Sequence, residues 1–245
     1  MAAAEAERPS VTGRHISRKY DEALEDVRTS VLEMGGVVEE QISRSLAALA
    51  AFDSEIGERV VRDDYKINRL EVQIDEECTR IIALRQPAAS DLRLVIAIIK
   101  TITDLERMGD EAEKIGRTAV RLAGNAPRRM RYAGVRNLGR HVQQMVHQAL
   151  DAFARLDVEA AVAIAREDKM VDLEYAACMR ELVTYMMEDP RRISEVLDMI
   201  WCARALERIA DHAKNIGEYI VFLVKGKDIR HTSLEHKELQ AQSEV

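Results

Sequence analysis

Two short segments of the chain carry the same pair of acidic residues at the same spacing. The segment LERMGDEAEKIG holds Glu106 and Asp110. The segment LERIADHAKNIG holds Glu207 and Asp211, and seven of the twelve positions are identical in the two segments. A spacing of four residues places both carboxylates on one side of a helix, where like charges repel by roughly 0.2–0.5 kcal/mol. The repetition of an unfavourable pair points to a role beyond folding.

A second polar pair with this spacing precedes each of these segments. Asp64 and Asn68 correspond to Asp168 and Asp172 in the second half of the chain. If the helices that carry the two pairs are antiparallel neighbours, four oxygen-bearing side chains face each other across an outer groove in each half. Hard or borderline cations such as Mg²⁺, Mn²⁺ or iron suit such ligands. Because Asn68 is uncharged, we expect the second half to hold the stronger site.

Two alternatives remain open for these carboxylates. At 100° per residue, Glu106 and Asp110 lie roughly 150° or more from the centre of the apolar stripe, as ordinary surface charges do. Arg107 and Arg208, which also repeat, offer a second explanation, since pairing with arginine would satisfy the carboxylates without metal. His212 has Glu111 as its counterpart, and we expect a surface histidine there, with an auxiliary ligand role as the alternative.

The sequence contains none of the catalytic signatures that we sought. It has no Gly-x-x-x-x-Gly-Lys phosphate loop, no Gly-x-Ser-x-Gly elbow and no His-Glu-x-x-His pair. Catalytic carboxylates usually lie in a cleft that shifts their pKa, whereas these are expected on a convex face. We therefore predict that the protein is not an enzyme, and we expect Trp201 to pack in the core or in an interface.

The composition of the 245 residues favours long helices. Hydrophobic residues make up 47% and charged residues 32%, whereas aromatic residues make up only 4%. The net charge of −7 argues against a nucleic-acid partner. We find no secretory signal and no apolar window long enough for a transmembrane segment. The three cysteines have no metal or redox spacing and are expected to be reduced core residues of a cytosolic protein.

The two segments belong to a longer duplication. At an offset of 101 residues, three apolar positions of the first segment's helix have apolar counterparts: Val95 in Val196, Leu105 in Leu206 and Ile115 in Ile216. Further upstream the offset becomes 104, so that Asp53 corresponds to Asp157 and Val38 to Val142. The change falls where the turn RQPAAS of the first half is replaced by the shorter EDP. Because insertions belong in turns, the pattern indicates a tandem repeat.

Each repeat is predicted to form three helices. In the first repeat, one helix ends near Phe52, Asp53 caps a second that runs to about Gln86, and a third ends near Gly124. In the second repeat, Asp157 and the pair Asp189–Pro190 provide the caps, and Gly226 ends the last helix. Short connections make neighbouring helices antiparallel. We therefore predict an all-α fold of two tandem three-helix bundles, residues 16–124 and 131–227, with flexible tails at 1–15 and 228–245.

The duplicated motifs resemble the PhoU family of phosphate-signalling regulators. The resemblance is carried by LRQPAASDLRLVIAIIKTITDLERMGDEAEKIGR in the first repeat and ALERIADHAKNIGEYIVFLVKGKDIRH in the second. It covers nearly the whole chain, from about Ile16 to His231, and it includes the order and spacing of the repeats.

The resemblance implies two three-helix bundles in a cytoplasmic protein that often forms homodimers. It also implies metal clusters on the bundle surface, bound in some members by Glu/Asp-x-x-x-Asp motifs. The corresponding residues of this chain are Asp64, Asn68, Glu106, Asp110, Asp168, Asp172, Glu207 and Asp211. Asn68 departs from the acidic pattern, and Mg, Mn, Fe and Zn are not distinguished.

The function implied by the resemblance is negative regulation of the phosphate-starvation response and modulation of phosphate uptake. The implied partners are the ATPase subunit of the phosphate ABC transporter and a sensor histidine kinase, and only they would bring the protein to a membrane. Two alternatives are kept beside this adaptor role: a metal-dependent hydrolase with a multinuclear surface site, and a helical scaffold without metal.

Overall fold

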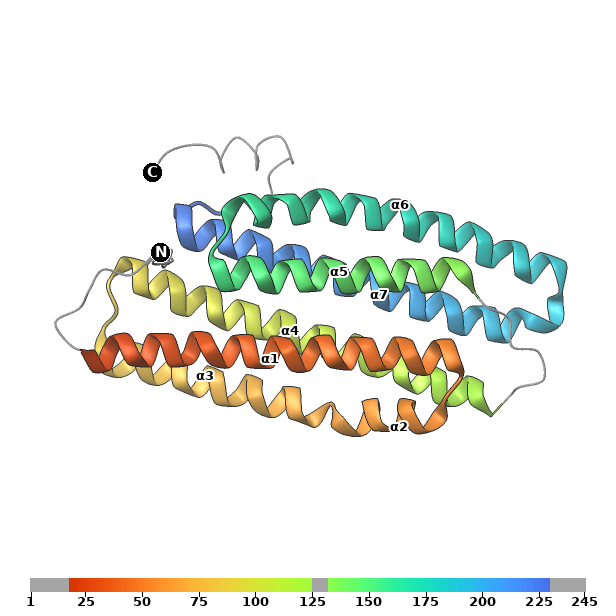
Figure 1. The fold of residues 1–245 in the computed structure, drawn as a ribbon, viewed down its shortest axis with the longest axis horizontal. Coiled ribbons are helices and arrows are strands. Elements are labelled where there is room, and N and C mark those ends of the chain that lie inside the picture. The colour runs from red at the N-terminus through yellow and green to blue at the C-terminus, as the bar shows by residue number, and fades with distance from the viewer. Residues whose placement is uncertain (1–17, 125–131, 230–245) are drawn as a thin grey trace, which may run out of the picture.

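The computed structural model describes residues 18–124 and 132–229, and every regular element in these two ranges is a helix (Figure 1). The elements are α1 (Arg18–Ala51), α2 (Ser54–Asp63), α3 (Tyr65–Arg85), α4 (Ala89–Ala123), α5 (Ala133–Arg155), α6 (Val158–Glu188), the 3₁₀ helix η1 (Pro190–Arg192) and α7 (Ile193–Lys225). Duplicated three-helix bundles are therefore confirmed, with α2 and α3 together taking the place of one long second helix.

The two bundles lie side by side and are joined along two antiparallel helix pairs. Helices α1 to α4 form one bundle and α5 to α7 form the other, and α4 packs along α7 while α1 packs along α5 (Figure 1). The ion pair between Glu111 and Arg208 and that between Arg121 and Asp198 fix the antiparallel register of α4 and α7. As a result, α4 and α7 are the central helices of the molecule and are covered from two sides.

The same turn joins the first and second helices of each repeat. Phe52 and Leu156 adopt left-handed backbone conformations, each with φ near 53°. The aspartate that follows each of them accepts a hydrogen bond from a backbone N–H three residues on: Asp53 from Ile56 at 3.0 Å, and Asp157 from Ala160 at 2.9 Å. The predicted caps at these two aspartates are confirmed, because a side-chain oxygen satisfies a donor that the first turn leaves open.

The second helix of the first repeat is interrupted, which the sequence pattern did not predict. It stops at Asp63 and restarts at Tyr65, whereas α6 runs without a break from Val158 to Glu188. Asp64 keeps helical dihedral angles at the break, and its carbonyl still accepts a hydrogen bond from the N–H of Ile67 at 3.0 Å. The interruption is thus local, and the apolar stripe continues across it with Val60 and Ile67 buried.

The ends of the last helix follow the sequence prediction closely. Asp189 caps η1 by accepting a hydrogen bond from the N–H of Arg191, and α7 continues from Ile193 to the left-handed Gly226. The predicted flexible tails lie outside the described residues, except for residues 228 and 229. Ile229 is buried, with 2% of its surface exposed, so packing extends past the end of α7.

The glycine that closes each repeated motif lets two helices approach closely. A Cβ atom on Gly116 would lie 2.9 Å from Cγ1 of Val60 on α2. A Cβ atom on Gly217 would lie 2.8 Å from the carbonyl oxygen of Ala161 on α6. Both repeats therefore need the absence of a side chain at this position, which explains why the motif ends in glycine twice.

We predict that Gly116→Ala lowers the free energy of unfolding by about 1–3 kcal/mol, because the added methyl group would overpack the contact with Val60. Gly36→Ala is the matched control, since Gly36 is also within a helix but an added Cβ would meet nothing within 4 Å. The control is expected to gain about 0.5–1 kcal/mol from helix propensity. Urea unfolding followed by circular dichroism measures both, and equal effects of the same sign would contradict the packing argument.

Candidate carboxylate site

In the first repeat, the predicted carboxylate at the break before α3 lies close to the two predicted carboxylates of α4, and two more carboxylates join them. Asp64, Glu106 and Asp110 are all half-buried. Asp110, Glu71 and Asp64 each raise the pKa of Glu106, which places these groups in one electrostatic cluster. Glu113 belongs to it as well, since it raises the pKa of Asp64. These side chains therefore lie outside the core, as predicted, but they are partly shielded from water, and α3 packs against α4 beside them.

Burial dominates the electrostatics of this first-repeat cluster. Desolvation is the largest cause of the raised pKa of Asp64, of Glu71 and of Glu106, and repulsion from neighbouring carboxylates adds to it in each case. A carboxylate whose pKa is raised is destabilised in its charged form. A bound cation would stabilise the charged form of these carboxylates, so the cluster is chemically suited to bind a cation.

The neutral members of the first-repeat cluster lie at its edge. Asn68 is exposed, and its amide is 3.5 Å from Oδ2 of Asp64. Gln41, which is buried on α1, donates a hydrogen bond from Nε2 to Oδ1 of Asp64 at 2.9 Å. Asp64 is thus held by two neutral amides, and the predicted row of Asp64 and Asn68 contributes one charge rather than two.

In the second repeat, the predicted row already contains a cation from the protein itself. The ammonium group of Lys214 on α7 lies 2.7 Å from Oδ2 of Asp168 and 2.9 Å from Oδ1 of Asp211. Burial alone would lower the pKa of Lys214, but its hydrogen bonds to the two aspartates raise that pKa above the ordinary value. Asp168 is itself buried, at 7% exposure, whereas Asp172 is exposed.

The first-repeat cluster therefore carries more negative charge than the second-repeat site, whereas we expected the second repeat to be the more acidic. The first repeat adds Glu71 and Glu113 to its predicted residues, and Glu113 is paired with Arg117. The second repeat adds only cations, Lys214 and also Arg204, which lies 2.6 Å from Glu207. As they stand, no three His, Cys, Asp or Glu side chains of residues 18–124 and 132–229 converge closely enough to hold a metal ion. The geometry thus favours the first cluster on charge and presents no preformed coordination sphere in either.

The two repeated arginines act differently from one another. Arg107 lowers the pKa of Glu71 and of Glu106, so it does partly offset the first-repeat carboxylates. Arg208 instead contacts Glu111 of the other bundle at 2.6 Å. Pairing with the repeated arginine therefore explains the first-repeat carboxylates in part. In the second repeat, Lys214 and Arg204 contact the carboxylates in place of Arg208.

His212 belongs to the seam between the bundles, and its expected surface position was wrong. The side chain is buried, and Nδ1 lies 2.7 Å from Oδ1 of Asp104 on α4. Asn215, one turn further along α7, also donates to Asp104 at 3.3 Å. Helical periodicity predicts one buried stripe, whereas α7 is covered by its own bundle and also by α4 of the other bundle, which buries His212.

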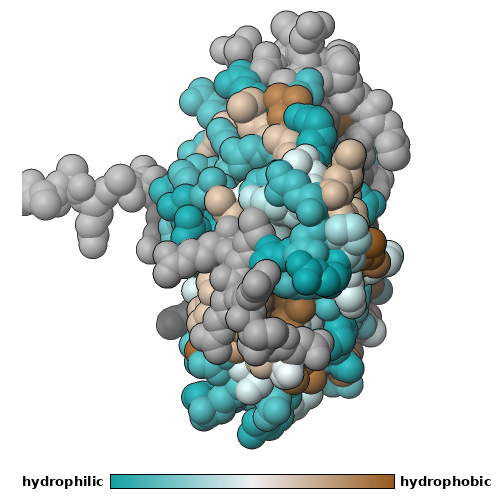
Figure 2. Space-filling view, turned by 90° about the vertical axis from the view of Figure 1, so that its right-hand side faces the viewer, coloured by the Kyte–Doolittle hydropathy of each residue, from teal (hydrophilic) through white to brown (hydrophobic). Residues whose placement is uncertain are grey.

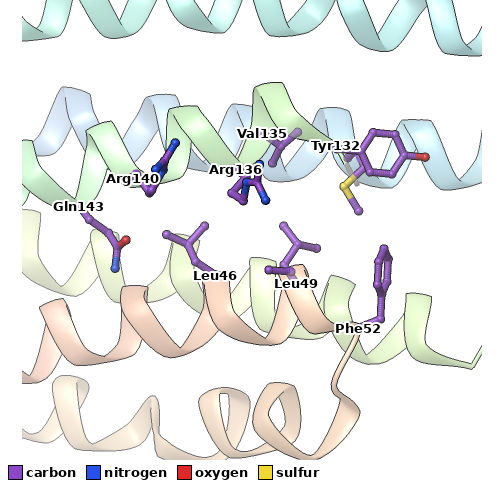
Figure 3. A pocket seen from close by; sticks show the side chains of 10 residues that line it. Leu46, Leu49, Phe52, Tyr132, Val135, Arg136, Arg140 and Gln143 are labelled. Carbon is purple, nitrogen blue, oxygen red and sulfur yellow. The ribbon is translucent and has the colours of Figure 1, made fainter. Parts of the chain in front are cut away.

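A separate cavity of about 360 Å³ lies between α1 and α5. Figure 3 shows apolar side chains from the end of α1 and the turn after it, Leu46, Leu49 and Phe52, below Val135 and the two arginines of α5, Arg136 and Arg140. Among the described residues that line this cavity there is no carboxylate, imidazole or thiol. It contains none of the predicted site residues, and the hydroxyl of Tyr132 is its one acidic group among the described residues.

Large apolar side chains are exposed at several places on the second bundle. Trp201 is 68% exposed and Met187 is 78% exposed. Of the two positions expected for Trp201, the core of this chain is therefore wrong, and an interface stays a prediction. At the end of the molecule where α6 leads into α7, hydrophilic side chains dominate the visible surface and apolar ones are scattered (Figure 2). These side chains are available for contact with other molecules without forming one large patch on that face.

Comparison with known proteins shows which family both halves of the chain match. The model of the PhoU domain matches the chain twice, over residues 31–119 and 135–220. The chain belongs to the PhoU family. It is 54% identical over 222 residues to the phosphate-specific transport system accessory protein PhoU homolog of Pseudomonas aeruginosa, covering 90% of this chain and 91% of that relative. It is 51% identical over 218 residues to the accessory protein PhoU of Escherichia coli, covering 89% and 90%.

Solved PhoU structures share the fold. The crystal structure of PhoU from Pseudomonas aeruginosa matches with a TM-score of 0.82 at 53% identity, covering 85% of this chain and all of that one. The phosphate transport system regulatory protein PhoU of Streptococcus pneumoniae matches with a TM-score of 0.79 at 32% identity, covering 85% and 98%. Within the part of this PhoU chain that the structure describes, none of the helices has the length and apolar character needed to cross a bilayer.

We predict that Glu106→Gln raises the free energy of unfolding of the metal-free protein at pH 7. The raised pKa of Glu106 means that its ionisation opposes folding, so stability linked to this group is present below the ordinary glutamate pKa of 4.5 and is lost as the pH rises through the higher folded value. The benefit of the substitution should therefore shrink as the pH falls towards 4.5. Thermal unfolding with a chelator present, from pH 4.5 to 7.5, measures this trend.

Glu33→Gln provides the control for this measurement, because Glu33 is an exposed glutamate of α1 outside the cluster. It is expected to change the melting temperature little at any of these pH values. Two results would contradict burial of the Glu106 carboxylate as the cause. One is a gain in melting temperature of Glu106→Gln that grows as the pH falls, and the other is a gain of equal size in Glu33→Gln.

Proposed function

We propose that this PhoU-family chain is a cytoplasmic accessory protein of a phosphate-specific transport system that restrains the phosphate-starvation response. The observation that carries the proposal is the family match over both repeats, together with relatives whose names give an accessory or regulatory role in phosphate transport. We further propose that the chain acts as an adaptor between the transporter's ATPase subunit and a sensor histidine kinase, with homodimers as its working form.

Several features of the fold support an adaptor rather than a catalyst. The long helices of the two bundles pack side by side. Exposed apolar side chains such as Met170, Leu173 and Trp201 offer contact points for other proteins. The cavity between α1 and α5 offers no acid, base or nucleophile of the usual catalytic kinds beyond Tyr132. A regulatory role needs surfaces that partners recognise, and the exposed apolar side chains support this role.

The first-repeat carboxylates give this adaptor a place for a cation. In our proposal, Glu106 and Asp110 of α4, with Asp64 and Glu71 beside them, hold a divalent or iron-type ion, and Mg, Mn, Fe and Zn are all compatible with oxygen ligands. Such an ion would offset the repulsion and desolvation that raise the pKa values in this cluster. Small side-chain movements would be required, because no three acidic groups of the described residues converge at ion-binding distance.

The adaptor role predicts direct binding to both partners. In co-purification with the purified protein, the phosphate transporter's ATPase subunit and the cytoplasmic part of the sensor kinase should each be retained, while the ATPase subunit of an unrelated ABC transporter should not. Folded protein that retains neither partner would contradict the proposal. Phosphate-ester turnover that disappears in Glu106→Ala would instead favour the hydrolase alternative.

A further inference from the structure

We propose that Lys214 is a built-in counter-ion that takes the place of a metal ion in the second repeat, so that the carboxylates of this repeat bind no metal ion. The inference deepens the proposed function, because it restricts the proposed cation site to the first repeat. It concerns Asp168, Asp172, Glu207 and Asp211, the four second-repeat residues that the sequence pattern predicts as metal ligands.

The contacts of Lys214 place its ammonium group where an ion would sit. It bridges the two rows, with Asp168 on α6 at 2.7 Å and Asp211 on its own helix at 2.9 Å. Only 24% of the Lys214 side chain and 10% of the Asp168 side chain are exposed, so the pair is largely shielded from water. Charge-assisted hydrogen bonds at these distances are strong, and shielding increases their strength.

A divalent ion would have to displace this ammonium group or bind beside it. Displacement breaks two charge-assisted hydrogen bonds, and binding beside it places like charges close together in a partly buried site. Arg204 adds to the obstacle, because its guanidinium lies 2.6 Å from Glu207 in the other acidic pair. Both acidic pairs of the second repeat therefore already have a cationic partner, although Oε2 of Glu207 is buried and accepts no hydrogen bond.

The corresponding positions of the first repeat carry the opposite or no charge. Lys214 corresponds to Glu113, which raises the pKa of Asp64 and forms an ion pair with the exposed Arg117. Arg204 corresponds to Thr103, whose hydroxyl bonds to the carbonyl of Ile99. Gln41 approaches Asp64 with a neutral amide, while its counterpart in the second repeat is the buried Met145. The difference between the repeats is thus that a lysine bridges the two acidic pairs in the second repeat, whereas in the first repeat that position is a glutamate paired with Arg117.

A reciprocal charge exchange tests the role of Lys214. The full chain and its variants are dialysed against Mn²⁺ at pH 7, and bound metal is counted by elemental analysis. Lys214→Glu, which restores the residue found in the first repeat, should gain one Mn²⁺ with an affinity at least about tenfold above that of the second repeat of the unmodified chain. Adding Asp211→Asn should remove the gained ion.

Lys214→Gln covers the case in which a fifth acidic residue prevents folding, and circular dichroism verifies that each variant is folded. It should also gain Mn²⁺, more weakly than Lys214→Glu. The converse variant, Glu113→Lys, should lose any Mn²⁺ that the first repeat binds. Arg166→Gln, on the exposed side of α6, changes a cation outside the cluster and should leave the count of bound Mn²⁺ unchanged.

Two results would overturn the inference. One is a folded Lys214→Gln and a folded Lys214→Glu that bind no more Mn²⁺ than the unmodified chain. The other is Mn²⁺ binding by the unmodified chain that disappears in Asp211→Asn. If the unmodified chain binds no Mn²⁺ but Lys214→Glu does, the Lys214 inference stands and the proposed first-repeat cation site fails, so the two ideas are tested separately.

Discussion

The antiparallel contact of α4 with α7 is the constraint on which the rest of the structure depends. Each of these helices completes the core of its own bundle and also covers the other bundle, through pairs such as Asp104 with His212 and Glu111 with Arg208. Burial on two sides leaves each helix only a narrow strip that is neither core nor seam. The repeated carboxylate pairs lie on this strip, next to the second helix of their own repeat.

The position of that strip explains the electrostatics of the site. A carboxylate there is close enough to a neighbouring helix to lose part of its hydration, yet it remains near enough to the surface for ions and long side chains to reach it. Burial therefore contributes more than mutual repulsion to the raised pKa of Glu106 and of Glu207. The chain offsets this cost in two ways, with neutral amides at Asp64 and with an ammonium group at Asp168.

The sequence predicted the fold well because helix period, caps and duplication are local signals. Leu105, Met108 and Ile115 are fully buried as the stripe indicated, and the caps at Asp53 and Asp157 form as expected. The surroundings of the site were predicted less well. His212 contacts Asp104 of the other bundle, and Lys214 contacts Asp168, although neither residue belongs to the repeated acidic pattern. Both contacts join helices that are far apart in sequence, so the sequence pattern does not reveal them. At the repeat offset of 101 residues, Lys214 corresponds to Glu113, and this change of charge is the sequence signal that the two sites differ.

The way in which the two repeats meet has a consequence for how such a chain arises. Antiparallel contacts of α4 with α7 and of α1 with α5 are the pattern of an isologous homodimer, in which each subunit presents the same face to the other. In a homodimer, every substitution appears in both subunits. Fusion into one chain removes that restriction, so one copy is free to carry a histidine or a lysine where the other carries glutamate. The differences at Glu111 and His212, and at Glu113 and Lys214, are of this kind.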